Sequence, residues 1–273
     1  MEHGFHLISG LPRSGSTLLS ALLRQNPKFH ASMTSPMLAL MNAMLRHMSQ
    51  ENEGAVFIDD DQRTRILRGV VDNFYADISP GQTIFDTNRG WTTKLWLLAK
   101  LFPQTKVICC VRNPAWVLDS LERLTRRNAL EPSGIFKYDP VGTVYTRAEG
   151  LMGANGMVGY AIAALREGVF DEHRGRLMLV RYETLVGDPK ATLAKIYEFV
   201  GAEPFEHDPD NIEEDYMSLE FDARLGAPGL HSVGGRVRRT TRPTLLPPDL
   251  FQKYAKDDFW ERKADYPEDL KVI

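Results

Sequence analysis

The residues from His6 to Pro27 read HLISGLPRSGSTLLSALLRQNP, and the turn inside this stretch has the composition of a phosphate-binding loop. The segment GLPRSGST fits the pattern G-x-x-x-x-G-x-[ST], with Gly10, Gly15 and Thr17 at the fixed positions. Consecutive backbone N–H groups in such a turn, together with the free N–H groups of the helix that follows, bind phosphate oxygens. The sequence therefore predicts an anion site at this loop.

Two departures separate this loop from the loops that bind nucleoside triphosphates. Ser16 stands where a lysine usually reaches the β- and γ-phosphates, and Arg13 lies inside the turn instead. The apolar run Lys106–Val111 is followed by Arg112, not by the acidic residue that would help to hold magnesium. We therefore expect a site without a metal, in which Arg13 projects towards the group that is transferred or left behind.

The stretch KVICCVRNPAWVLDSLERL predicts a second anion site. Arg112 follows an apolar run, and Ser120 lies eight residues later, two turns into the next helical pattern. The carboxyl ends of the strands form the ligand crevice of a doubly wound sheet, so we expect Arg112 close to the first loop. Either residue alone fits an ordinary surface position. Together with the altered loop, the two predict a second phosphate at some distance from the first.

Short apolar runs alternate with helical patterns along the chain. The runs typical of buried strands are Phe5–Ser9, Thr83–Asp86, Lys106–Val111 and Leu177–Val180. The helical patterns are Ser16–Arg24, Pro36–Met48, Gln62–Ala76, Thr92–Leu101, Ala115–Arg126, Gly156–Glu167 and Pro189–Val200. This alternation predicts an α/β fold in a single domain, with a parallel sheet flanked by helices on both faces. Residues 128–150 and 226–248 are expected to be irregular, and long segments of this kind are often functional lids.

The composition excludes several classes of partner. A net charge of −3 over 273 residues gives no general attraction to nucleic acid or to an anionic membrane. Cys109 and Cys110 are adjacent in an apolar run, which suits neither a disulfide framework nor a zinc site and favours a reducing cytoplasm. The opening residues MEHGFHLISG lack the pattern of a secretory signal, and no apolar run is long enough for a membrane span. The oligomeric state stays open.

Four stretches together resemble the sulfotransferases that use 3′-phosphoadenosine 5′-phosphosulfate (PAPS). LPRSGSTLL resembles the family's loop for the 5′-phosphosulfate, and VRNPAWVLDSL resembles its 3′-phosphate motif. RYETLVGDPKATLAKIYEFVG and RPTLLPPDLFQKY are similar to later segments, the second to the end of many bacterial members. The resemblance implies a P-loop type α/β domain over residues 1–273, no metal, PAPS as cosubstrate and 3′-phosphoadenosine 5′-phosphate (PAP) as product.

The resemblance also assigns binding residues by position. Those for the 5′ side are Arg13, Ser14, Gly15, Ser16 and Thr17, and those for the 3′-phosphate are Arg112 and Ser120. It further implies that a basic loop, residues 226–248, closes over the cofactor with Arg236, Arg238, Arg239 and Arg242. Arg13 is expected to neutralise the bridging oxygen as charge develops on the leaving PAP.

The bases that the family uses are missing from their usual places. One branch, the tyrosyl-protein sulfotransferases, has a glutamate where this chain reads HASMTSPM, which contains no acidic residue. The cytosolic branch has a histidine where this chain reads FDTNRGW, which contains no histidine. The family's usual lysine is also missing from this second segment. We predict Asp86 as the base, because it lies at the carboxyl end of a strand, with Asn88 and Arg89 to orient the sulfonate or the acceptor. The rivals are His30, Thr34, Ser35 and the run Asp59–Asp61. His231 lies in the expected lid and could touch the ligand, although a surface position is favoured.

The sequence therefore predicts a sulfotransferase that moves a sulfonate from PAPS to a hydroxyl group of a small molecule or a peptide. A P-loop kinase for small molecules is the alternative enzyme, disfavoured by Ser16 and by the absent metal-binding acid. A nucleotide-binding protein without catalysis is the third possibility, because the family bases are absent. Trp91, Trp96 and Trp116 could line a pocket for a phenol, although their helical spacing favours the core.

Overall fold

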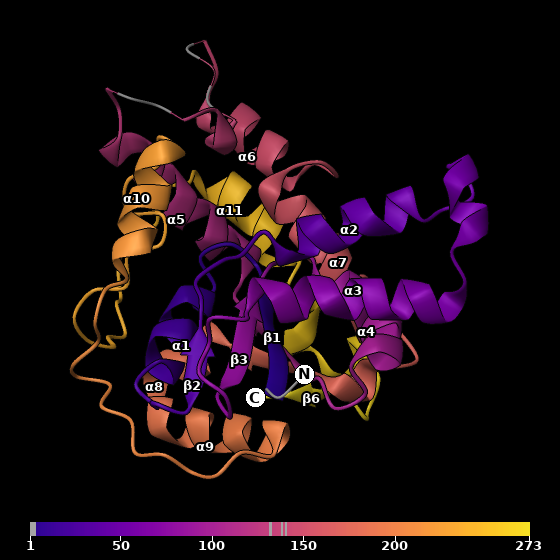
Figure 1. The fold of residues 1–273 in the computed structure, drawn as a ribbon. Coiled ribbons are helices and arrows are strands. Elements are labelled where there is room, and N and C mark those ends of the chain that lie inside the picture. Colours follow the sequence, from indigo (N-terminus) through magenta and orange to yellow (C-terminus); the bar gives the residue numbers. More distant parts are fainter. Residues whose placement is uncertain (1–3, 131–132, 138, 140) are drawn as a thin grey trace.

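A parallel β-sheet of six strands forms the centre of the structure, a computed structural model that describes residues 4–130, 133–137, 139 and 141–273 (Figure 1). The strands lie in the order β2-β3-β1-β4-β5-β6. Their bounds are Gly4–Gly10 (β1), Phe29–Ala31 (β2), Thr83–Thr87 (β3), Val107–Val111 (β4), Leu177–Arg181 (β5) and Lys271–Val272 (β6). The chain turns to one side of β1 for β2 and β3 and crosses to the other side for β4. This reversal makes the carboxyl end of β1 the expected ligand crevice.

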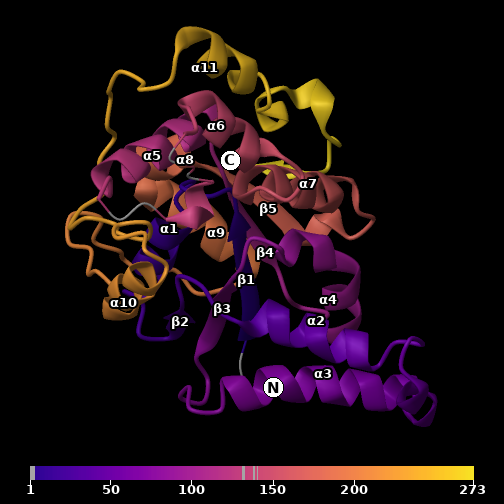
Figure 2. The same ribbon diagram turned by 90° about the horizontal axis from the view of Figure 1, so that it is seen from above.

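Helices cover both faces of the sheet, as predicted (Figure 2). One face packs against α1 (Ser16–Leu23), α8 (Tyr182–Gly187) and α9 (Pro189–Val200). The other packs against α2 (Met37–His47), α3 (Asp60–Phe74), α4 (Leu95–Leu101), α5 (Pro114–Arg127), α6 (Val144–Met152), α7 (Met157–Phe170) and α11 (Pro248–Ala255). No helix in the described part of the chain is long and apolar enough to cross a bilayer.

The central strand β4 shows why the sheet needs two layers of helices. Successive side chains of a strand point to opposite faces. Ile108 and Cys110 therefore join the core beside α1, while Val107, Cys109 and Val111 join the core on the other face. All five are buried. Both cysteines are free, and burial raises the pKa of Cys110 to about 12, so this thiol is protonated and unreactive at neutral pH.

The four predicted strands are confirmed, but the structure contains elements that the sequence pattern did not indicate. Strands β2 and β6 have three and two residues, too few to produce a periodic signal. The prediction that residues 128–150 are irregular was wrong over most of α6. This helix begins with a capping box between Thr143 and Thr146 and buries Ala148 and Leu151. Residues 226–247 contain no helix or strand, as expected.

Candidate active site

Two glycines with positive φ angles shape the loop between β1 and α1. Gly10 has a φ of 149°, and a Cβ atom there would lie 2.4 Å from the carbonyl oxygen of Cys110. Gly15, the N-cap of α1, has a φ of 99°, and its Cβ would lie 3.1 Å from the ring of Tyr182. A side chain at either position would be strained. The two fixed glycines of the motif thus let the loop lie directly against β4 and α8.

The loop is held by its own backbone and by Ser14. The N–H of Leu11 donates to the carbonyl of Cys110 at 3.0 Å, and the Ser14 hydroxyl lies within hydrogen-bond distance of the carbonyl oxygens of Leu11 and Cys110. Ser14 is fully buried behind the loop. Its side chain therefore supports the loop and is not part of the cavity lining, unlike Arg13, Gly15, Ser16 and Thr17.

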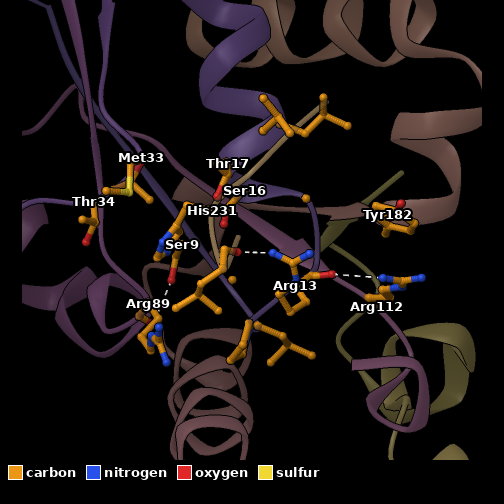
Figure 3. Close-up of a pocket in the computed structure, with 18 of the residues that line it drawn as sticks. Ser9, Arg13, Ser16, Thr17, Met33, Thr34, Arg89, Arg112, Tyr182 and His231 are labelled. Carbon is orange, nitrogen blue, oxygen red and sulfur yellow. Dashed lines mark hydrogen bonds between the residues drawn. The ribbon is translucent and has the colours of Figure 1, made fainter. Parts of the chain in front are cut away.

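A cavity of about 200 Å³ lies over the loop at the carboxyl ends of β1 and β3 (Figure 3). The first turn of α1 opens into it, so the helix's free N–H groups are available to an anion there. The lining comes from the loop, from the segments after β2, β3 and β4, from α7 and α8, and from residues 230–233. The lining residues outside the stretch Ser9–Leu18 are Met33, Thr34, Thr87, Asn88, Arg89, Arg112, Met157, Tyr182, Leu230, His231, Ser232 and Val233.

Arg13 connects the loop to the predicted 3′-phosphate residue. Its Nε donates to Oγ of Ser120 on α5 at 3.1 Å. Its Nη1 donates to the carbonyl of Leu230 and lies 3.4 Å from the carbonyl of Gly229. The structure thus brings Arg13 and Ser120, predicted for the two different phosphates, into one cluster with the segment that follows α10 (Tyr216–Arg224).

Arg112 completes this cluster from the end of β4. Its Nη1 donates to the carbonyl of Arg13 at 3.2 Å, and its guanidinium lies 4.0 Å from the ring centre of Tyr182. Its Nε is buried and has no hydrogen-bond partner in the described part of the chain. Burial lowers the pKa of both Arg13 and Arg112, and among the described residues neither forms an ion pair with a carboxylate. Two neighbouring, partly buried cations that have no carboxylate partner among the described residues form a site that favours an anion.

The predicted basic loop is anchored beside this cluster. Asp119, fully buried on α5, accepts hydrogen bonds from Arg242 Nη2 at 3.1 Å, from the Thr244 hydroxyl at 3.1 Å and from the Leu245 N–H at 2.6 Å. The other predicted arginines, Arg236, Arg238 and Arg239, are exposed and do not line the cavity. Two of them, Arg236 and Arg238, line a groove of about 370 Å³ that shares Tyr182 with the cavity.

On the far side of the cavity, the segment after β3 contributes two polar side chains. Asn88 lines the cavity, and its Oδ1 accepts the N–H of Gly90 at 3.0 Å, which fixes the turn. Arg89 also lines it, burial lowers the pKa of its guanidinium, and within the described residues it has no carboxylate partner. This guanidinium is a further cation available to a negatively charged group in the cavity.

The structure places the predicted base, Asp86, outside this lining. Asp86 is fully buried and lies on the same side of β3 as Ile84, because alternate side chains share a face. Its carboxyl group accepts hydrogen bonds from Ser35, from Tyr75 and, at 2.6 Å, from Nε1 of Trp91. Burial raises the pKa of Asp86, and these three hydrogen bonds offset part of the rise. A basic role for Asp86 stays a prediction.

The other candidates for the base lie partly inside and partly outside the cavity lining. Thr34 lines the cavity, whereas His30 and Ser35 are not part of the lining. Asp59 caps α3 and the two aspartates after it start that helix at the surface. The three tryptophans are not in the lining: Trp91 contacts Asp86, Trp96 is 48% exposed and Trp116 packs on Phe251. His231, for which a surface position was favoured over contact with the ligand, lies in the lining, and no local sequence pattern signals its partner, Asp222.

A parallel α/β sheet whose first strand leads through a glycine-rich loop into a helix is the fold class of P-loop type proteins. The sequence model of the sulfotransferase family matches residues 7–207, and this chain belongs to that family. It is 21% identical to protein-tyrosine sulfotransferase 2 of chicken over 249 residues, and 28% identical to the nodulation protein NoeE of Sinorhizobium fredii over 211 residues. These matches cover 89% and 71% of this chain but only 60% and 49% of the two relatives.

Solved structures share the fold. A mouse sulfotransferase complexed with PAP superimposes with a TM-score of 0.51 at 14% identity, over 96% of this chain and 85% of the mouse chain. At this level of identity the likeness concerns the fold alone. It agrees with the predicted α/β sheet flanked by helices on both faces.

Proposed function

We propose that this protein is a sulfotransferase that moves a sulfonate from PAPS to a hydroxyl group of an acceptor. The observation that carries the proposal is the cluster of Arg13, Arg112 and Ser120 beside the phosphate loop. Two partly buried guanidinium groups that meet no carboxylate in the described part of the chain favour a ligand that brings its own negative charges. A nucleotide with phosphates on both the 5′ and the 3′ positions supplies them at two places.

The two anion sites divide the donor between them in this proposal. The loop and the first turn of α1 bind the 5′ side, with Arg13, Gly15, Ser16 and Thr17 in contact and Ser14 supporting the loop. Arg112 and Ser120 bind the 3′-phosphate, where the Nε of Arg112 gains a partner. The nucleoside lies by the ring of Tyr182, in the groove that leads to residues 236–240.

The basic segment closes this arrangement. We propose that residues 1–273 belong to one sulfotransferase domain in which residues 226–248 cover the donor. Asp119 anchors Arg242 and Leu245 next to Ser120. The exposed Arg236, Arg238 and Arg239 are then free to fold onto the phosphates, because among the described residues none of the three is in an ion pair.

For the transfer itself we assign charge stabilisation to Arg13 and orientation to Asn88 and Arg89. Arg13 stabilises the charge that develops on the leaving phosphate, and Arg89 offers a desolvated cation to the sulfonate. The acceptor is a small molecule or a peptide. The chicken relative is a protein-tyrosine sulfotransferase, which makes a tyrosine peptide one candidate. Buried, unreactive thiols suit the cytoplasmic location that we include in this proposal.

The proposed donor site is tested by comparing the affinities for PAP and ADP, two isomers that carry their two phosphates at different positions. Isothermal calorimetry without magnesium should show that PAP binds at least tens-fold more tightly than ADP. Leaving a desolvated arginine without its anion costs about 2–5 kcal/mol, which corresponds to a preference of that size or more. Arg112→Ala should remove most of the preference by weakening PAP while hardly changing ADP. Arg65→Ala, an exposed arginine on α3, is the control and should change neither affinity.

A transfer assay tests the reaction itself. PAP released from PAPS is measured with 2-naphthol, hexanol or a tyrosine-containing peptide as acceptor, and at least one of these hydroxyl compounds should accelerate the release. Equal binding of PAP and ADP, or a magnesium-dependent preference for ADP, would overturn the proposal in favour of a kinase. Tight PAP binding without transfer to any acceptor would indicate a nucleotide-binding protein without catalysis.

A further inference from the structure

A histidine–carboxylate pair stands at the wall of the cavity, in the segment after α10. His231 lines the cavity, and Asp222 on α10 is 1% exposed. The Nδ1 atom of His231 lies 2.6 Å from Oδ1 of Asp222. The other carboxylate oxygen, Oδ2, accepts the backbone N–H of His231 at 2.7 Å. The buried carboxylate therefore holds both the backbone and the ring of His231.

This geometry sets the tautomer of the imidazole. A carboxylate can only accept hydrogen bonds, so Nδ1 carries the proton and Nε2 keeps its lone pair. The same division of roles makes a histidine the base in hydrolases that use a buried aspartate. Figure 3 shows His231 together with Ser9, Thr17 and Met33, all of which line the cavity. The lone pair is thus offered close to the place where the phosphate loop holds the donor.

The segment that carries His231 is also tied to the loop. The guanidinium of Arg13 donates to the carbonyl of Leu230, the residue immediately before His231. Asp86, in contrast, has three donors on its carboxyl group and is not part of the cavity lining. Of these two groups, only His231 combines access to the cavity with a buried partner that fixes its ring and its backbone.

We propose that His231 is the general base of the sulfonate transfer and that Asp222 is its positioning residue. The proposal rests on the sulfotransferase function proposed above. The acceptor's hydroxyl oxygen bonds to sulfur while the bond between sulfur and the bridging oxygen breaks. The hydroxyl proton passes to Nε2 of His231, and the electron pair of the broken bond remains on the leaving PAP. The products are the sulfate ester, PAP and the imidazolium, which later loses its proton to water.

Two substitutions test the pair. His231→Gln should lower kcat by two to four orders of magnitude, the usual range for a general base, while the Kd for PAP changes by less than about threefold. Asp222→Asn should act through the tautomer. The amide oxygen must accept the His231 N–H, so its NH₂ group faces Nδ1 and drives the ring proton to Nε2. We expect kcat to fall by at least tenfold, with the Kd for PAP again unchanged, which a merely structural role would not produce.

Two control variants complete the kinetic test. His47→Gln, at an exposed position of α2, should leave kcat unchanged. Asp86→Asn should retain more of the wild-type kcat than His231→Gln does. If the wild type transfers sulfonate and His231→Gln keeps most of that turnover, the base assignment is wrong while the proposed function stands. If the wild type itself fails to prefer PAP over ADP, the function is the part that fails.

A labelling experiment decides the question without turnover. Diethyl pyrocarbonate modifies imidazole nitrogens that carry a free lone pair, and mass spectrometry of peptides identifies each modified histidine. With PAP at a concentration that calorimetry shows to be saturating, modification of His231 should slow by at least tenfold while that of His47 is unchanged. An unchanged rate at His231 would show that its imidazole does not face the donor site and would overturn the proposal.

Discussion

At the scale of single residues, Arg13 combines an unusual backbone conformation with an unusual environment. Its φ of 59° lies in the left-handed region, which costs a residue other than glycine about 1–3 kcal/mol. In that conformation its side chain reaches Ser120 on one side and the carbonyl of Leu230 on the other. A guanidinium that is partly buried beside Arg112 and contacts no carboxylate in the described structure suits a charge that the ligand supplies.

The substitution Arg13→Ala tests this role. The change removes the cation that we propose next to the leaving phosphate, and also the tether of the segment that carries His231. We expect kcat to fall by about 100-fold or more, the scale of one preorganised donor, and the affinity for PAP to fall much less. Steady-state kinetics with PAPS and calorimetry with PAP give the two values, and Arg65→Ala is again the control. Equal losses in both would reduce Arg13 to a binding residue.

At the scale of elements, the central strand β1 carries a buried titratable group that links its packing to pH. His6 is 8% exposed, and its Nδ1 accepts the backbone N–H of Lys106 at 3.2 Å. Burial, together with the charge of Lys106, lowers the pKa of His6 to about 4. The unfolded chain therefore takes up a proton near pH 6.5, where the folded protein does not. Stability from this group is complete above pH 6.5 and is lost as the pH falls towards 4.

The expected loss is about 3 kcal/mol of unfolding free energy between pH 7 and pH 4, from the difference between the two pKa values. Urea denaturation of the wild type and of His6→Gln across this range measures it. The glutamine variant should be less stable at pH 7 and should lose less stability on acidification than the wild type. Parallel pH profiles of the two proteins would show that His6 does not titrate with folding.

At the scale of the whole molecule, residues 226–247 join parts of the chain that are far apart in sequence. The segment contacts Arg13 in the first loop through Leu230, is held by Asp119 on α5 through Leu245, and leads into α11 at Pro248. Between these anchors lie the exposed Arg236, Arg238 and Arg239. An irregular segment that is fixed at both ends and exposed in the middle has the form of a closing lid.

Limited proteolysis tests the closure. Trypsin cleaves after arginine, so the exposed arginines at 236, 238 and 239 are expected to be early cleavage sites of the free protein. Saturating PAP should slow these cleavages by tenfold or more if, as proposed, residues 226–248 fold onto the phosphates. Cleavage after Arg65 on α3 is the internal control and should keep its rate. A cleavage pattern that PAP leaves unchanged would contradict the closing role of residues 226–248.

Much of the site could be predicted because its signals are local. The backbone conformation of the loop requires glycine at positions 10 and 15, and Arg112 directly follows an apolar strand. The spacing of residues within each short motif was therefore enough to indicate a candidate anion site. The α/β class followed in the same way from alternating strand and helix patterns. These features depend on the backbone path within a few residues of each motif.

Only the tertiary structure decided which side chains meet. Strands of two or three residues have no periodic signal and exist because neighbouring strands bind them, as β6 shows beside β5. The face of β3 turns Asp86 towards Tyr75 and Trp91 instead of the cavity. Asp222 and His231 lie on different segments, and Arg13 is 107 residues from Ser120. Such contacts depend on how the elements pack against one another. The spacing of residues along the chain indicates helices, strands and turns, but it does not indicate which distant residues become the neighbours of a buried side chain.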